Sequence, residues 1–350
     1  MQRLSGAKWG YVTRRMDAGE RDNFLIGGVT QEPRLGDFVV ATVAKLGEHE
    51  ALEDPHGRRA RLYPGDMLVG AYGNRYATDF YEGYMPGVGD AVHLLTSGGL
   101  IGTVASSHTS RGEPTELEVI GALTKADGVP LNTEDFVAPA PAQARPELGT
   151  IVVLGSGMNA GKTTATAAIV RGLSRAGLKV GAGKVTGSGS GKDHWSYVDA
   201  GAAYVAEFLD FGMPSTFGYP VDRLMKTTVD IRDHLVARGA DVVVLEVADG
   251  VLQDETRYLA SQLPGFADHV VLAVGDALGA VAGIGVLAEL KVPVRAVSGL
   301  VTASPLATRE AAAATDLPVV SPAELAGGAA VDLLAEISVD DLAKLDGSPA

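Results

Sequence analysis

The chain has 350 residues, no cysteine and a formal net charge of −14, from 43 Asp and Glu against 29 Lys and Arg. Without cysteine it can form neither a disulfide framework nor a thiolate metal site, and it has no cysteine nucleophile. The acidic balance disfavours a general nucleic-acid binder, and the length predicts about two domains.

Residues 1–137 are predicted to form a small β-rich domain. Short β-branched and apolar runs, among them Phe38 to Val43 and Met67 to Tyr72, are separated by turn residues. Ser97-Gly98-Gly99 predicts a hairpin between the runs 91–96 and 100–105. Several short strands at close spacing indicate a β-barrel or a β-sandwich.

Alternating Ala and Pro then predict a linker over residues 138–147. Proline fixes its own φ and lacks a backbone N–H, so this stretch cannot continue a helix or a central strand. The linker separates the β-rich domain from a second domain, residues 148–350.

After the linker, apolar strands alternate with helices. Strands are predicted at residues 151–154, 179–182, 242–247, 270–274, 295–301 and 318–320, and helices at 164–176, 197–211, 222–238 and 277–288. Such strands indicate an α/β domain with a mainly parallel sheet, covered on both faces. Ligands of these sheets bind at the carboxyl ends of the strands.

Neither a secretory signal nor a membrane span is predicted. The first residues have no apolar stretch of the signal-peptide type, and the apolar run 277–288 is too short to cross a bilayer. We therefore expect a cytoplasmic protein with no membrane role.

The run Ser156 to Thr163 predicts a phosphate-binding loop, because it follows an apolar strand and begins a helix. Lys162 would neutralise the outer phosphates, and Thr163 would offer its hydroxyl to Mg²⁺. The strict pattern has Gly where Ser156 stands. The predicted nucleotide-binding residues are Ser156, Gly157, Met158, Asn159, Ala160, Gly161, Lys162, Thr163 and Thr164.

A glycine-rich segment, residues 183–193, follows the second strand of this domain. We expect Lys184 to reach the transferred phosphoryl group and Asp193 to hold Mg²⁺, directly or through water. The glycines suggest a segment that orders when a ligand binds. The alternative is a flexible glycine loop whose charges are solvated.

The apolar strand 242–247 runs into two acidic residues, Glu246 and Asp249. A carboxylate inside an apolar strand is costly to bury without a partner, so Glu246 is predicted to face the metal. Asp249 is predicted to be catalytic, as the base when the acceptor is a hydroxyl. A turn-capping role is the alternative for Asp249.

Together, the run Gly155 to Thr163, Lys184 and the strand that carries Glu246 resemble the dethiobiotin synthetase-like branch of P-loop NTPases, over residues 148–325. The resemblance implies that Lys162 and Thr163 bind ATP and Mg²⁺. It also implies catalytic roles for Lys184, Asp193 and Glu246. The N-terminal β-rich domain is not part of that family. No Asn-Lys-x-Asp guanine signature is found, which favours ATP over GTP.

We therefore expect ATP- and Mg²⁺-dependent phosphoryl transfer to a small-molecule acceptor, by a kinase or in the activating step of a ligase. Two alternatives stay open. One is a nucleotide-switch NTPase for cofactor or metal delivery, and the other is a polynucleotide-end kinase whose N-terminal domain binds the nucleic acid. Because related folds often dimerise, a homo-oligomer is expected.

Overall fold

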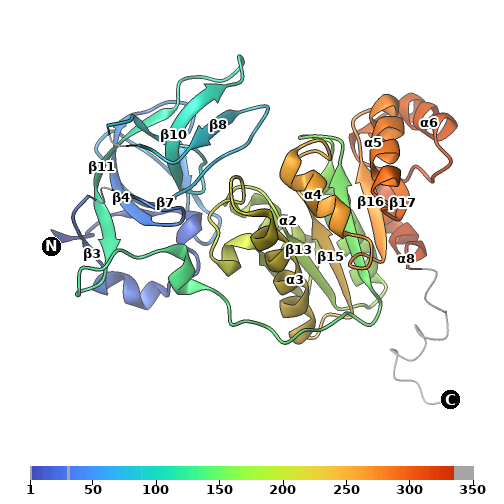
Figure 1. The fold of residues 1–350 in the computed structure, drawn as a ribbon, viewed down its shortest axis with the longest axis horizontal. Coiled ribbons are helices and arrows are strands. Elements are labelled where there is room, and N and C mark those ends of the chain that lie inside the picture. Colours follow the sequence, from blue (N-terminus) through green and yellow to red (C-terminus); the bar gives the residue numbers. More distant parts are fainter. Residues whose placement is uncertain (1, 30–31, 88, 335–350) are drawn as a thin grey trace. The chain divides into compact units, whose positions relative to one another are not determined.

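The computed structural model describes residues 2–29, 32–87 and 89–334 (Figure 1). The chain divides into two compact units. Unit 1 takes the residues up to Pro139 together with Thr186–Trp195 and Glu207–Pro220. Unit 2 takes Ala140–Val185, Ser196–Ala206 and the residues from Val221 onward. Two segments of the second half of the chain therefore belong to unit 1.

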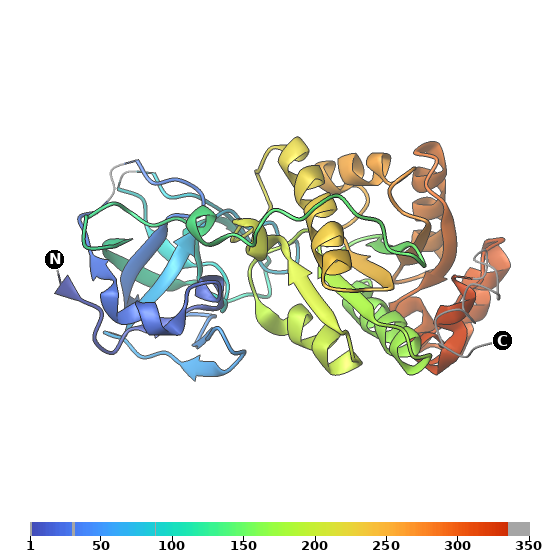
Figure 2. The same cartoon turned by 90° about the horizontal axis from the view of Figure 1, so that it is seen from below.

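Unit 1 is built around a small closed β-barrel. Pairings run in a ring from β11 to β4, β7, β10, β9 and back to β11. Figure 2 shows these strands, coloured blue to green, from a second direction. The strands are β1 (Gln2–Arg3), β2 (Lys8–Trp9), β3 (Leu25–Ile26), β4 (Phe38–Lys45), β5 (Ala51–Glu53), β6 (Arg59–Arg61), β7 (Met67–Tyr72), β8 (Tyr81–Tyr84), β9 (Val92–Leu94), β10 (Leu100–Ser107) and β11 (Thr115–Thr124). Short 3₁₀ helices lie at Tyr11–Thr13, Ala18–Asn23, Thr133–Phe136 and Phe208–Phe211. Because these pairings form a closed ring, the predicted β-rich domain is a β-barrel rather than a β-sandwich.

Polar contacts inside unit 1 hold the two segments from the second half of the chain. Glu53, at the end of β5, accepts hydrogen bonds from the Ser190 hydroxyl and the Gly191 amide, each at 3.1 Å. Arg14 forms ion pairs with both Glu207 and Asp210. The glycine-rich segment is thus tied to the barrel unit through a buried carboxylate.

Unit 2 contains a mainly parallel sheet of the order β14-β13-β15-β12-β16-β17. The pairings of β12 with β15 and β16, of β13 with β15, and of β16 with β17 are parallel. The strands are β12 (Thr150–Gly155), β13 (Val180–Lys184), β14 (Tyr204–Glu207), β15 (Val242–Glu246), β16 (His269–Ala273) and β17 (Val294–Ser298). The helices are α1 (Lys162–Arg175), α2 (Gly191–Ala200), α3 (Val221–Ala237), α4 (Asp254–Gln262), α5 (Ala277–Glu289), α6 (Pro305–Ala314), α7 (Pro322–Glu324) and α8 (Ala330–Asp332), with a 3₁₀ helix at Leu300–Ala303 and a π-helix at Leu325–Ala329. The first half of α2, through Trp195, belongs to unit 1.

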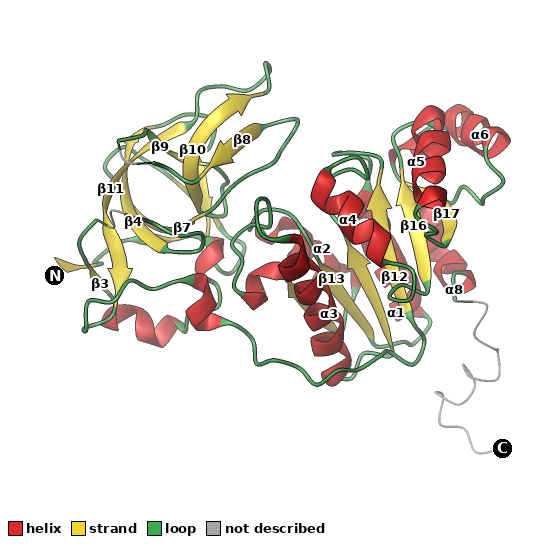
Figure 3. Cartoon of the chain, in the orientation of Figure 1, coloured by secondary structure: helices red, strands yellow, loops and turns green. Residues whose placement is uncertain are grey.

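Helices cover both faces of this sheet (Figure 3). Successive residues of a strand point to opposite faces. In β12, Ile151 and Val153 pack in the core that α1 contributes to, whereas Val152 lies with Met225 of α3 and Leu259 of α4. Every residue of β12 is buried, which explains why residues 151–154 of this strand are all apolar.

The predicted helix over residues 197–211 is wrong. Helix α2 covers Gly191–Ala200 and ends before Gly201, whose φ of 97° lies in the left-handed region. The chain then forms the strand β14 and a short 3₁₀ helix. Residues 318–320 do not form a strand either, since Val319 makes only an isolated parallel bridge to Val297.

Helices α4 and α6 were not anticipated from the sequence pattern. Both begin at side-chain caps, from Gln253 and Ser304 respectively. Among the described residues, the structure contains no helix of the length and apolar character that a membrane crossing requires.

Candidate functional site

The run Ser156 to Thr163 forms a strand-loop-helix element of the P-loop NTPase type in unit 2. Strand β12 ends at Gly155, and α1 begins at Lys162. Asn159 and Gly161 have φ values of 59° and 94°, so the loop uses left-handed conformations at two positions. Ser156 is not one of the positive-φ positions. The one departure from the strict motif therefore creates no backbone strain.

Three glycines allow close contacts at this loop, one with the Lys162 side chain and two with loop backbone. A Cβ atom on Gly155 would lie 2.7 Å from Cδ of Lys162. On Gly250 it would lie 2.7 Å from the Ser156 carbonyl oxygen, and on Gly299 it would lie 2.2 Å from the Ala160 carbonyl oxygen. Gly250 follows β15 and Gly299 follows β17, so the carboxyl ends of three strands surround the loop.

Lys162 is buried and its Nζ donates to the Gly157 carbonyl oxygen at 2.7 Å. Burial lowers the pKa of Lys162, while the carboxylates of Glu246 and Asp249 oppose that shift. A phosphate group placed in the loop would lie beside this ammonium group and stabilise its charged form. The geometry therefore fits an anion held by Lys162 and the loop amides.

The Thr163 hydroxyl and Glu246 form a pair of oxygen donors beside Lys162. Thr163 Oγ1 donates to Glu246 Oε1 at 3.1 Å, and Glu246 is 2% exposed. A hydroxyl that donates its hydrogen to a carboxylate still has lone pairs to offer a cation. Mg²⁺ prefers oxygen ligands and commonly takes one or two from protein and the rest from phosphates and water. This donor set fits Mg²⁺.

No three His, Cys, Asp or Glu side chains within residues 2–29, 32–87 and 89–334 gather closely enough to hold a metal by themselves.

Lys184 and Asp249 lie near the same loop. Lys184 ends β13 and is the parallel register partner of Glu246 on β15. Asp249 has a φ of 64°, and burial raises its pKa from 3.8 to about 6 although Lys162 and Lys184 lower it. A carboxyl with that pKa near two lysines can exchange a proton at neutral pH.

Two other predicted site residues, Thr164 and Asp193, lie in the first turns of two different helices. Thr164 lies in the first turn of α1 and is exposed. Asp193 lies in the first turn of α2, among the residues of unit 1. The assignment of Asp193 as a metal ligand stays a prediction.

The sequence reasoning missed Tyr197. This α2 residue is fully buried, and its hydroxyl donates to Glu246 Oε2. The sequence contained no signal for this contact, because Tyr197 and Glu246 are 49 residues apart and lie on different elements. Only the packing of α2 brings the two side chains together.

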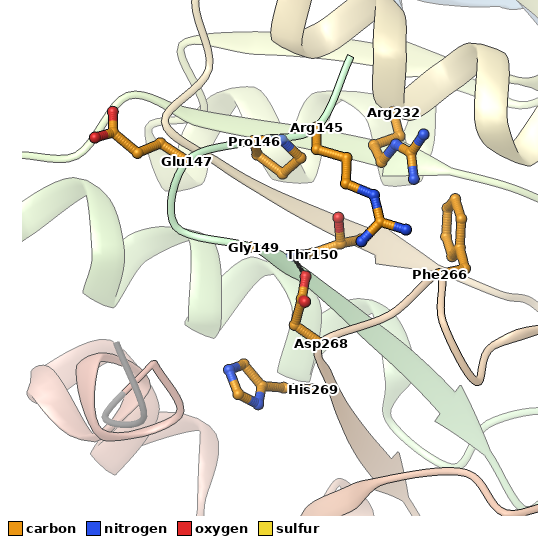
Figure 4. Close-up of a pocket in the computed structure, with 9 residues that line it drawn as sticks. All are labelled: Arg145, Pro146, Glu147, Gly149, Thr150, Arg232, Phe266, Asp268 and His269. Carbon is orange, nitrogen blue, oxygen red and sulfur yellow. Dashed lines mark hydrogen bonds between the residues drawn. The ribbon is translucent and has the colours of Figure 1, made fainter. Parts of the chain in front are cut away.

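A separate cavity of about 290 Å³ lies at the amino ends of β12 and β16, opposite the edge that carries the phosphate loop (Figure 4). Three of its charged side chains, Arg145, Arg232 and Asp268, are already engaged. Arg232 pairs with Asp233 at 2.7 Å, and Arg145 donates to the Gly265 carbonyl oxygen at 2.7 Å. Asp268 accepts from the Thr150 amide at 2.7 Å. We therefore place the candidate site at the phosphate loop.

No protein-family model matches the chain, and no curated protein matches its sequence. Solved structures similar to it include the signal recognition particle receptor FtsY from Elizabethkingia anophelis, with 19% identity and a TM-score of 0.32 over 46% of this chain and 52% of that chain. The signal recognition particle 54 kDa protein from Aeropyrum pernix K1, in complex with GDP, has 18% identity and a TM-score of 0.38 over 59% and 50%. Chloroplast FtsY from Physcomitrella patens has 15% identity and a TM-score of 0.36 over 52% and 61%.

The chain thus spans about half the length of the first two of these proteins. The description of unit 2 as a P-loop NTPase-like fold rests on its own strand order and on the β12-loop-α1 element.

Proposed function

We propose that this protein is a Mg²⁺-dependent enzyme that transfers the γ-phosphoryl group of ATP to a small-molecule acceptor, as a kinase or in the activating step of a ligase. The observation that carries the proposal is the gathering of Lys184 and Asp249 beside Lys162 of the phosphate loop. Nucleotide binding alone requires neither residue. A second lysine and a titratable carboxyl are the groups that a transfer reaction needs.

Each residue would have a distinct role. The loop amides and Lys162 hold the β- and γ-phosphates, and Lys184 stabilises the charge that develops on the transferred group. Thr163 and Glu246 hold Mg²⁺, which supplies further neutralisation of phosphate charge. Asp249 accepts the proton when the acceptor is a hydroxyl. These roles are the ones that the resemblance to the dethiobiotin synthetase-like branch implies for the matching residues, and the assignment to that branch is part of the proposal.

The choice of ATP rests on the sequence at the end of β17, Ser298-Gly299-Leu300-Val301, which is not a guanine signature. Direct competition between ATP and GTP for the site tests this choice. We also expect a homodimer, which sedimentation of the full chain measures.

The test compares Lys162→Ala and Lys184→Ala with the wild type. We expect Lys162→Ala to abolish ATP binding. Lys184→Ala should lower acceptor-dependent release of ADP by about 100-fold while ATP affinity changes little, because the charge that it stabilises develops only during transfer. Screening acceptors by ADP release identifies the second substrate. Turnover that needs a protein partner and no small acceptor would favour a nucleotide switch instead.

A further inference from the structure

Tyr197 occupies a fixed position next to the acidic residue of the candidate site. It lies on α2, its side chain is 0% exposed, and its hydroxyl donates to Glu246 Oε2. The other carboxylate oxygen, Oε1, accepts from Thr163 Oγ1. The two oxygens of Glu246 are therefore held by two different helices, α1 and α2.

This arrangement restricts the rotation of the Glu246 carboxylate. A glutamate side chain has several rotatable bonds, and its terminal torsion is broad and roughly two-fold. A buried tyrosine ring, by contrast, is held by packing on all sides, so its hydroxyl is a fixed reference point. With Oε2 held by Tyr197, Oε1 faces Thr163 and stays there.

The same contact reduces the cost of burying Glu246. This carboxylate ends an otherwise apolar strand and is 2% exposed. A buried charge without hydrogen-bond donors is strongly unfavourable, and each donor to a charged group contributes to its stability. Tyr197 is a neutral donor, so it stabilises the carboxylate without competing with Mg²⁺ for the site.

We propose that Tyr197 is a positioning residue that orients Glu246 and thereby sets the Mg²⁺ affinity of the nucleotide site. This inference rests on the proposed function. Tyr197 does not touch the nucleotide or the metal in this role, and it acts only through Glu246. Residues that orient a metal-binding group in this way typically change metal affinity by about 10- to 100-fold when they are replaced.

The test is a Mg²⁺ titration of Tyr197→Phe, which removes only the hydroxyl. Binding of methylanthraniloyl-ATP is followed by fluorescence, first in EDTA and then with increasing MgCl₂. We expect the Mg²⁺ midpoint to rise at least about 10-fold, with the affinity in EDTA unchanged. Tyr204→Phe is the matched control, since Tyr204 lies on β14, its ring contacts Arg238, and it has no role in the site. Its midpoint should equal that of the wild type.

Three results would overturn the inference, and they have different meanings. If the wild type responds to Mg²⁺ and Tyr197→Phe has the same Mg²⁺ midpoint, the inference about Tyr197 is wrong, but the proposed function stands. Equal losses of affinity in EDTA and in Mg²⁺ would show that Tyr197 only packs the unit. A wild type that binds no analogue under either condition would overturn the proposed function as well.

Discussion

At the scale of single residues, the site depends on charged groups whose surroundings change their ordinary chemistry. Lys162 and Glu246 are both almost fully buried, and Asp249 has a positive φ that few residues other than glycine adopt. Buried ionisable groups of this kind are expensive for a fold and are concentrated at functional sites. They are therefore a better indication of the site than any cavity in the structure.

The raised pKa of Asp249 predicts a pH-dependent stability. Its folded pKa is about 6, above the usual 3.8, so its contribution to stability is fully present below about pH 4 and is lost as the pH rises through about 6. Asp249→Asn replaces the carboxyl with a neutral amide, so the variant does not lose stability through ionisation at this position as the pH rises. We expect the variant to be more stable than the wild type by about 1–3 kcal/mol above pH 7, and equal to it near pH 4. Urea unfolding at a series of pH values measures the difference. A difference that is constant with pH would contradict the assigned pKa.

At the scale of elements, the glycine-rich segment shows how sequence and structure differ. Its position after the second strand could be predicted, because an apolar run precedes it. Its attachment to Glu53 could not, since Glu53 and Ser190 are 137 residues apart. The predicted helix 197–211 wrongly included β14, because the sequence of this strand does not identify it. Tyr204 to Glu207 have no alternating pattern of their own, and pairing at the edge of the sheet decides their conformation.

The ion pairs of Arg14 give a prediction at this scale. Arg14 forms ion pairs with the buried carboxylates of Glu207 and Asp210, at the start of a 3₁₀ helix. A second cation, Arg15, lies with its Nε 3.8 Å from Asp210 Oδ1. Burial and the nearby Glu207 also raise the pKa of Tyr11, which donates to Glu207 at 2.8 Å. Arg14→Ala leaves two buried carboxylates without this cation. We expect a loss of about 3–5 kcal/mol in the free energy of unfolding.

Urea unfolding of Arg14→Ala, followed by tryptophan fluorescence, measures this loss. Lys226→Ala is the control, because Lys226 is 70% exposed and pairs with Asp230 on the surface of α3. Its change should stay below about 1 kcal/mol. Similar effects of the two substitutions would mean that the Arg14 pairs are solvated.

At the scale of the whole molecule, the two units are not consecutive in the sequence. Segments Thr186–Trp195 and Glu207–Pro220 leave unit 2 after β13 and β14 and belong to unit 1. A fragment that starts at residue 140 therefore lacks the partners of both segments, including Glu53 and Arg14.

We expect this fragment to be cut by proteinase K within residues 186–195 and 207–220, at sites that the full chain protects. Limited proteolysis with mass spectrometry identifies the cleavage sites. In the full chain, the exposed linker near Ala142 and Gln143 serves as the positive control for cleavage. Equal protection of the two segments in the fragment and the full chain would show that unit 2 stabilises them by itself.

The sequence by itself determined the elements whose information is local. The phosphate loop, its strand and helix, the parallel character of the sheet and the acidic end of β15 follow from apolar runs, glycines and charges that are close together in the chain. Only the tertiary structure decided that the N-terminal strands close into a barrel, that segments of the second half join that barrel, and that Tyr197 holds Glu246. These features depend on contacts between residues far apart in sequence. Such contacts are selected by packing and by the need to pair buried polar groups, which no local pattern encodes.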